Sequence, residues 1–99
     1  ITISGIDNFS ASQIGAFAPP YPNPASALTC IPVHLKQDAN VKVTLIDALG
    51  RTIEVIHDGM LYSGETKLFF QASSIPAGAY VISLENNQAR LATSRIMIQ

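Results

Sequence analysis

Charged side chains are scarce in this chain, and neither sign of charge predominates. Asp, Glu, Lys and Arg make up 13% of the 99 residues, against about 25% in typical soluble domains. The net charge is −1, and the arginines Arg51, Arg90 and Arg95 are scattered along the sequence. Without a basic cluster the chain lacks an electrostatic surface that attracts phosphates, so nucleic-acid binding is excluded.

Cysteine and the residue patterns of catalysis are also nearly absent. Tryptophan is missing, and Cys30 is the single cysteine, so no internal disulfide can form. Cys30 is expected to be a small apolar residue in a strand. Cys30 and His34 share a strand face, but two ligands do not make a zinc site, and we expect no metal and no cofactor. Because no nucleophile elbow or acid–base constellation occurs, the sequence argues against an enzyme.

Long apolar runs and helical periodicity are lacking as well. No apolar run approaches the roughly 20 residues that span a bilayer, so no transmembrane segment is expected. No stretch repeats apolar residues with a 3.6-residue period. Short runs of alternating apolar and polar residues dominate instead, broken by Gly, Pro and Asn. This pattern predicts an all-β, immunoglobulin-like antiparallel β-sandwich of Greek-key type with six to seven strands.

Composition divides the chain near residue 20. Residues 1–20 are rich in Ser, Ala, Gly and Pro and are interpreted as a linker or N-terminal arm, with a possible short strand at Thr2–Ile6 or Gln13–Ala18. Tyr21-Pro22-Asn23-Pro24 follows, and its two prolines fix φ twice and remove two donors. We expect this rigid turn to open a domain over residues 21–99, with Gln99 as the natural C-terminus.

The first clear strand is expected at Leu28–Leu35. Its inward face would carry Thr29, Ile31, Val33 and Leu35, and its outward face Cys30, Pro32 and His34. Because Pro32 cannot donate a ladder hydrogen bond, the strand is predicted to lie at a sheet edge. Further strands are predicted at Val41–Asp47, Thr52–His57, Glu65–Gln71, Ala79–Glu85 and Gln88–Gln99.

Side-chain orientation and turns follow from the same alternation. Inward residues are predicted to be Val41, Val43, Leu45, Leu68, Phe70, Tyr80, Ile82, Leu84, Ile96 and Ile98, with Lys42, Thr44 and Phe69 outward. Turns are predicted at Asp47–Arg51, where Gly50 permits positive φ and Leu49 is an apolar plug, and at Asp58-Gly59. Gly78 is expected to serve the backbone, and Tyr80 to form a tyrosine corner that fills the core and bonds an upstream carbonyl.

Four motifs carry a family resemblance. They are Tyr21-Pro22-Asn23-Pro24-Ala25-Ser26, Asp47-Ala48-Leu49-Gly50-Arg51, Ile75-Pro76-Ala77-Gly78-Ala79-Tyr80-Val81-Ile82-Ser83-Leu84 and Arg95-Ile96-Met97-Ile98-Gln99. In this order they resemble the opening motif, the D-x-x-G-R turn, the L-P-x-G-x-Y-x-V-x-L strand and the closing strand of type IX secretion system C-terminal sorting domains (type A, Por secretion system). The immunoglobulin-like module of flagellar hook-cap proteins shares two of these motifs and is a competing assignment.

The resemblance implies a non-catalytic secretion signal at the C-terminus of a cargo protein in a Bacteroidota-type bacterium. The folded domain would pass through the periplasm and be recognised by the outer-membrane translocon and its shuttle protein. A sortase-like cysteine peptidase would then cut before Tyr21, leaving the cargo at the cell surface or secreted.

Recognition is expected to use the final strand with its neighbour Ala79–Glu85. The candidate contacts are Arg95, Ile96, Met97, Ile98 and Gln99, with Arg51 as a further one. A strand at a sheet edge exposes unpaired N–H and C=O groups, so a receptor could add a strand or grip the free carboxylate. The alternative is that these residues only complete the core. The structural motif residues are Tyr21, Pro22, Asn23, Pro24, Asp47, Gly50, Pro76, Gly78 and Tyr80.

Two other functions stay open at this point. An adhesion or carbohydrate-binding module would need exposed aromatic residues, for which Tyr62 and Phe69 are the candidates. The other is a structural spacer module of a cell-surface protein. In a self-associating structural piece, the exposed edge strand and the N-terminal arm would permit a strand-swapped homodimer.

Overall fold

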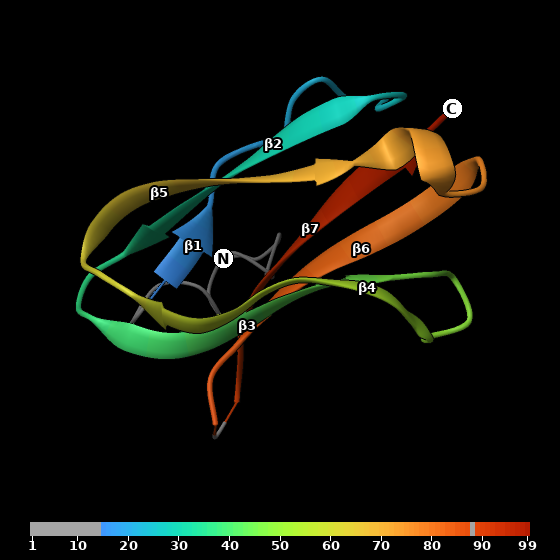
Figure 1. Ribbon diagram of the computed structural model, residues 1–99. Coiled ribbons are helices and arrows are strands. Elements are labelled where there is room, and N and C mark those ends of the chain that lie inside the picture. The colour runs from blue at the N-terminus through green and yellow to red at the C-terminus, as the bar shows by residue number, and fades with distance from the viewer. Residues whose placement is uncertain (1–14, 88) are drawn as a thin grey trace, which may run out of the picture.

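The structure is a computed structural model that describes residues 15–87 and 89–99, which form two packed antiparallel sheets (Figure 1). The three-stranded sheet has the order β1-β2-β5, and the four-stranded sheet has the order β4-β3-β6-β7. The elements in chain order are β1 (Gly15–Phe17), β2 (Leu28–Leu35), β3 (Ala39–Ile46), β4 (Thr52–Leu61), β5 (Gly64–Gln71), the short 3-10 helix η1 (Ala72–Ser74), β6 (Gly78–Glu85) and β7 (Arg90–Ile98). The predicted all-β sandwich is confirmed.

Alternating apolar side chains from both sheets fill the space between the layers. The inward residues predicted for β2, β3 and β6 are buried, namely Thr29, Ile31, Val33, Leu35, Val41, Val43, Leu45, Tyr80, Ile82 and Leu84. Ile96 and Ile98 of β7 and Phe70 of β5 are buried with them, while Phe69 is exposed, as predicted. Each fully buried aliphatic side chain contributes about 1.5–3 kcal/mol relative to exposure, so this alternation fixes which face of each strand turns inward.

The predicted turn at Asp58-Gly59 is wrong, because both residues lie inside β4. Asp58 pairs with Lys42 and Gly59 with Val41, and the strand continues to Leu61. Leu61 is buried in the core, which favours the longer strand. The chain turns instead between β4 and β5, where the Asp38 carboxylate accepts a hydrogen bond from the Ser63 N–H at 2.8 Å.

The predicted edge position of β2 is also wrong, since β2 lies between β1 and β5. The Pro32 carbonyl accepts a hydrogen bond from the Ala18 N–H at 3.0 Å, so Pro32 turns its backbone polar atoms toward the chain just beyond β1. The missing donor therefore falls where the β1 ladder ends, and the proline does not interrupt a central ladder. Pro32 and Cys30 face away from the core but are nonetheless buried.

Two further side-chain predictions need correction. Leu49 is 77% exposed and does not plug its turn, which is held instead by backbone N–H groups that donate hydrogen bonds to the Asp47 carboxylate. Thr44 faces outward but is buried, because it is a small residue on a central strand between Val55 and Ser83 on the neighbouring strands. The burial of Thr44 thus reflects its central position in the sheet and not a second core.

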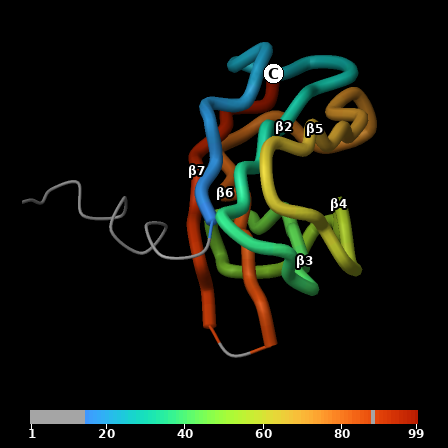
Figure 2. Tube along the Cα trace, turned by 90° about the vertical axis from the view of Figure 1, so that its left-hand side faces the viewer, coloured from blue at the N-terminus to red at the C-terminus, as the bar shows by residue number. Residues whose placement is uncertain are grey.

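The N-terminal segment runs beside the last strand. Of the two predicted positions for a short N-terminal strand, Gln13–Ala18 contains β1, whereas Thr2–Ile6 lies outside the described residues. Figure 2 shows β1 next to β7, where the two sheets come together at one side of the sandwich. β7 is a single strand at the edge of its sheet, as the position of the closing strand predicted.

The predicted tyrosine corner is confirmed. The ring of Tyr80 is buried, and its hydroxyl donates a hydrogen bond to the Pro76 carbonyl at 2.6 Å. This bond spans the corner between η1 and β6 and joins the loop at Pro76 to the beginning of β6. Gly50 has φ +85° in the turn after β3, so the glycine predicted there is required by the backbone.

We expect Tyr80→Phe to lower the free energy of unfolding by about 1 kcal/mol, because it removes one partly buried hydrogen bond and keeps the ring. Urea denaturation of the variant and of Tyr62→Phe would measure this. Tyr62 is 68% exposed, so its loss of a hydroxyl should leave the midpoint unchanged. Equal midpoints for all three proteins would contradict the role assigned to the Tyr80 hydroxyl.

Candidate functional site

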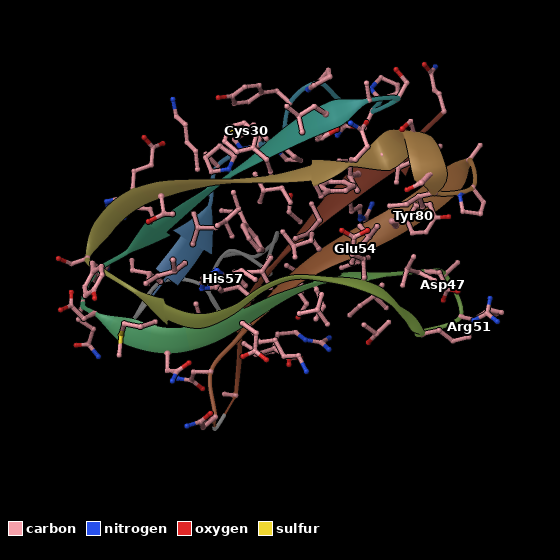
Figure 3. All side chains as sticks on the ribbon, viewed as in Figure 1. Cys30, Asp47, Arg51, Glu54, His57 and Tyr80 are labelled. Carbon is pink, nitrogen blue, oxygen red and sulfur yellow. The ribbon has the colours of Figure 1, made fainter. Side chains whose placement is uncertain are left out.

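The four motifs meet at one groove of about 450 Å³. Each motif contributes to its lining, although the motifs are far apart in the sequence. The lining residues are Asn23, Asp47, Ala48, Ala79, Tyr80, Val81, Arg95, Ile96 and Met97. Figure 3 shows Asp47 and Tyr80 at the same end of the sandwich. A concave surface built by several motifs is the natural candidate for a binding site.

The wall of the groove is the outward face of the β6–β7 pair. Ala79 pairs with Met97 and Val81 pairs with Arg95 across the two strands. Since Tyr80 lies on the core side, its neighbours along β6 point the opposite way. Met97 is 49% exposed, which leaves its apolar side chain available for contact. The wall is therefore largely apolar, with one cation beside it.

A segment that we call the strap, Tyr21–Ala25, lies along the end of β7. The Met97 N–H donates to the Asn23 side-chain oxygen Oδ1 at 3.0 Å, and the Asn23 Nδ2 donates to the Arg95 carbonyl at 3.5 Å. The Ala25 N–H donates to the Met97 carbonyl at 2.7 Å, and the Gln99 N–H donates to the Ala25 carbonyl at 2.8 Å. The strap thus pairs with successive backbone N–H and C=O groups along the edge of β7.

The expectation of an open backbone edge at the end of β7 is wrong. Strand addition needs unpaired N–H and C=O groups, and those of Met97 are taken by Asn23 and Ala25. The physical reason is that an Asn side chain carries the same donor and acceptor as a peptide group. The Asn23 side chain therefore replaces the backbone hydrogen bonds that a neighbouring strand would otherwise make with β7. What remains accessible on this part of β7 is its outward side-chain face.

The turn after β3 is organised by the Asp47 carboxylate. Its Oδ1 accepts the N–H groups of Leu49 and Arg51, both at 2.9 Å, and its Oδ2 accepts the Arg51 Nε at 2.8 Å. The hydrogen bond from the Arg51 backbone, together with the other donors, holds the pKa of Asp47 below its ordinary value of 3.8. Figure 3 shows Arg51 beside Asp47 at the tip of the turn.

The candidate contact residues divide into four groups. Ile96 and Ile98 are buried, so their side chains complete the core. Arg95 and Met97 turn outward beside the groove, whereas Arg51 is engaged in its own turn and does not line the groove. The strap holds Gln99 through its backbone N–H. Ala79 and Val81 also line the groove, and both belong to the neighbouring strand Ala79–Glu85 that the sequence indicated as part of the recognition surface.

Cys30 lies beneath Tyr21 and not beside a ligand set. The two residues pair in an isolated β-bridge, and the side-chain hydrogen bond that the Tyr21 phenol donates to Cys30 raises the pKa of the phenol. Within residues 15–87 and 89–99, no group of three or more His, Cys, Asp or Glu side chains is placed to hold a metal ion. The same part of the chain contains no helix with the length and apolarity to cross a membrane.

We expect Asp47→Asn to remove a pH-dependent contribution to stability. The amide oxygen still accepts the turn N–H groups, but the charge is lost. Because the folded-state pKa of Asp47 is lowered, the carboxylate stabilises the fold fully above about pH 4, and this stabilisation disappears as the pH falls through the lowered pKa.

Urea midpoints measured from pH 7 to about pH 2 check this sign. The wild type should be more stable than Asp47→Asn at pH 7, and the difference should close in acid. Asp58→Asn, on β4, is the matched control for removal of one carboxylate. A difference between wild type and Asp47→Asn that stays constant with pH would refute the interpretation.

We expect Asn23→Ala to open the edge of β7 locally. The Met97 N–H loses its acceptor, so its hydrogen exchange should accelerate more than that of residues in the β6–β7 ladder. The free energy of unfolding should fall by about 1 kcal/mol, as for one hydrogen bond. Amide exchange followed by NMR measures this, with Asn87→Ala in the β6–β7 turn as control. Unchanged protection of Met97 would show that the strap does not hold the edge.

Comparison with known proteins agrees with the geometry. A family model described as the secretion system C-terminal sorting domain matches residues 20–99, which include the strap and every strand from β2 to β7. A search of curated proteins finds no match to the chain. The match covers far more than half of the sequence, and the four motifs that it contains are those that build the groove. The chain belongs to the family of secretion system C-terminal sorting domains, which are sorting signals for the type IX secretion system.

Proposed function

We propose that the type IX machinery recognises this domain through the groove between the strap, the turn after β3 and the outward face of β6–β7. The observation that carries this proposal is the convergence of all four motifs on one surface. Residues that only built the core would be buried, but Met97 is half exposed and Arg95 is exposed. A signal that a receptor reads on a folded domain has to lie on such a surface.

The closed edge of β7 supports a mode of recognition based on side chains. Asn23 and Ala25 occupy the backbone groups that an added strand would need. The apolar side chains of Val81 and Met97 and the charge of Arg95 remain for contact. Burial of a few such apolar groups provides affinity, while the polar rim provides specificity. The groove is therefore a better candidate than the edge.

The family fixes the coarser statements about partners and location. A domain of this kind interacts with the type IX machinery and accompanies export across the outer membrane, to the surface or beyond, and the family is not known as catalytic. Within our proposal the domain itself has no catalytic role, and it reaches the translocon through the periplasm. The direct partners would be the shuttle protein and then the cysteine peptidase, which cuts in the arm of residues 1–20.

The adhesion or carbohydrate-binding function has weaker support. Of the exposed aromatic residues, Tyr62 lies in the connection before β5 and Phe69 lies within β5. They are seven positions apart along an extended chain, which separates them by roughly 20 Å at about 3.3 Å per residue. They therefore cannot stack on one sugar ring.

A strand-swapped homodimer would exchange the segment of β1 and the strap between two copies, since that segment contacts the rest of the fold through β2 and β7.

We expect Met97→Gln to reduce surface delivery of a fused reporter about tenfold, because it replaces an apolar contact of the groove with a polar group of similar size. The reporter carries its own export leader and is expressed in a bacterium with a type IX system. Surface and periplasmic fractions are then compared by immunoblot.

The matched control is Met60→Gln on β4. Met60 is exposed to the same fraction, 49%, as Met97, but it does not line the groove. Urea denaturation should give both variants the wild-type free energy of unfolding within about 0.5 kcal/mol. Equal delivery of the two variants would rule the groove out as the recognition site, and the edges of β4 and β5 would become the candidates.

A further inference from the structure

The donors and acceptors around the groove are unequally used, and this inequality indicates what the groove binds. Asp47 is an acceptor whose Oδ1 already receives two backbone N–H groups and whose Oδ2 receives the Arg51 Nε. Asn23 is a second side-chain acceptor, and its Oδ1 receives the Met97 N–H. The acceptors of Asp47 and Asn23 are therefore committed to holding the turn and the strap.

The hydrogen-bond donors of Arg95 and Asn23, by contrast, are incompletely used. Arg51 pairs with Asp47 at 2.8 Å and Arg90 pairs with Glu85 at 3.3 Å. Arg95, the third arginine, has no carboxylate within ion-pair distance among the residues that the structure describes, and it lines the groove. The Asn23 Nδ2 has two hydrogens and makes one long hydrogen bond of 3.5 Å. A ligand that satisfies these groups has to bring acceptors.

The local charge leads to the same conclusion. The ionised side chains in the lining are Asp47 and Arg95, and Arg51 neutralises Asp47 from within the turn. The groove therefore presents one uncompensated positive charge beside apolar side chains. An Arg guanidinium matches a carboxylate with two parallel hydrogen bonds, and an anion placed there is attracted without displacing an existing partner.

We propose that the groove accepts an extended segment of the partner protein that sets an Asp or Glu carboxylate against Arg95 and a neighbouring apolar side chain against Val81 and Met97. This inference rests on the proposed function, because it names the chemistry of the partner at the same site. A protein segment fits better than a phosphate-bearing lipid. The apolar wall needs an apolar group beside the anion, and the single cation does not make the multiple charge contacts that phosphates favour.

Binding of the whole chain to the detergent-purified shuttle protein of the translocon tests the proposal. Arg95→Gln should weaken binding about tenfold at low salt, as for loss of one close charge pair. Arg90→Gln is the matched control on the same strand, and its affinity should stay within about twofold of wild type. Binding by the wild type should weaken as salt is added, and binding by Arg95→Gln should be less sensitive to salt.

Three results would overturn the proposal. Equal affinities of Arg95→Gln and Arg90→Gln would show that no carboxylate meets Arg95. Unchanged salt dependence in Arg95→Gln would assign the electrostatic contact to another residue. Binding to anionic phospholipid vesicles that depends on Arg95, without any effect of Arg95 on binding to the shuttle protein, would identify a lipid phosphate as the anion.

The variant Met97→Gln separates this inference from the proposed function. If Met97→Gln weakens binding to the shuttle protein and Arg95→Gln does not, the groove is the site but its partner carries no carboxylate there. If neither variant weakens binding, the groove itself is not read and both proposals fail. Circular dichroism and urea midpoints of each variant verify that the comparison is made between folded proteins.

Discussion

The strap's hydrogen bonds to β7 are the interaction on which the site depends. A sheet ends in a strand that has one row of backbone groups without a partner strand. Here Asn23 and Ala25 supply those partners at Met97 and Gln99. On its other side Tyr21 exchanges two backbone hydrogen bonds with Cys30 of β2. The strap therefore links β2 of one sheet to the edge strand β7 of the other, and in doing so it sets Asn23 beside Arg95 in the groove.

Closure of one edge determines how the domain can present its final strand. The edge of β7 is covered by β1 and then by the strap (Figure 2), so the accessible part of β7 is its outward face. The opposite edge strand of the same sheet, β4, pairs with β3 through two register shifts. Such irregularities bend a strand and make its edge a poor template for another chain. The sheet thus limits backbone pairing at both edges and leaves side-chain chemistry as the basis of recognition.

The sequence predicted the features that local periodicity controls. Alternation identified the buried faces of β2, β3 and β6, and the corner before β6 identified the hydrogen-bonded Tyr80. It failed where distant segments decide the outcome. Pro32 suggested an edge because β1 was not known to end beside it, and Asp58-Gly59 suggested a turn because the burial of Leu61 was not visible. The strap could not be foreseen, since Asn23 and Met97 are 74 residues apart.

The composition of the strap follows from the same constraint. A segment that pairs with the last strand would itself become a new edge, with its own N–H groups facing solvent. Pro22 and Pro24 flank Asn23 and carry no N–H. The Ala25 N–H is used on Met97 and the Tyr21 N–H on Cys30, so between them the strap has few donors left for a further strand. Two prolines around one asparagine thus close an edge without creating another, which gives the motif a physical reason that its resemblance to a family does not supply.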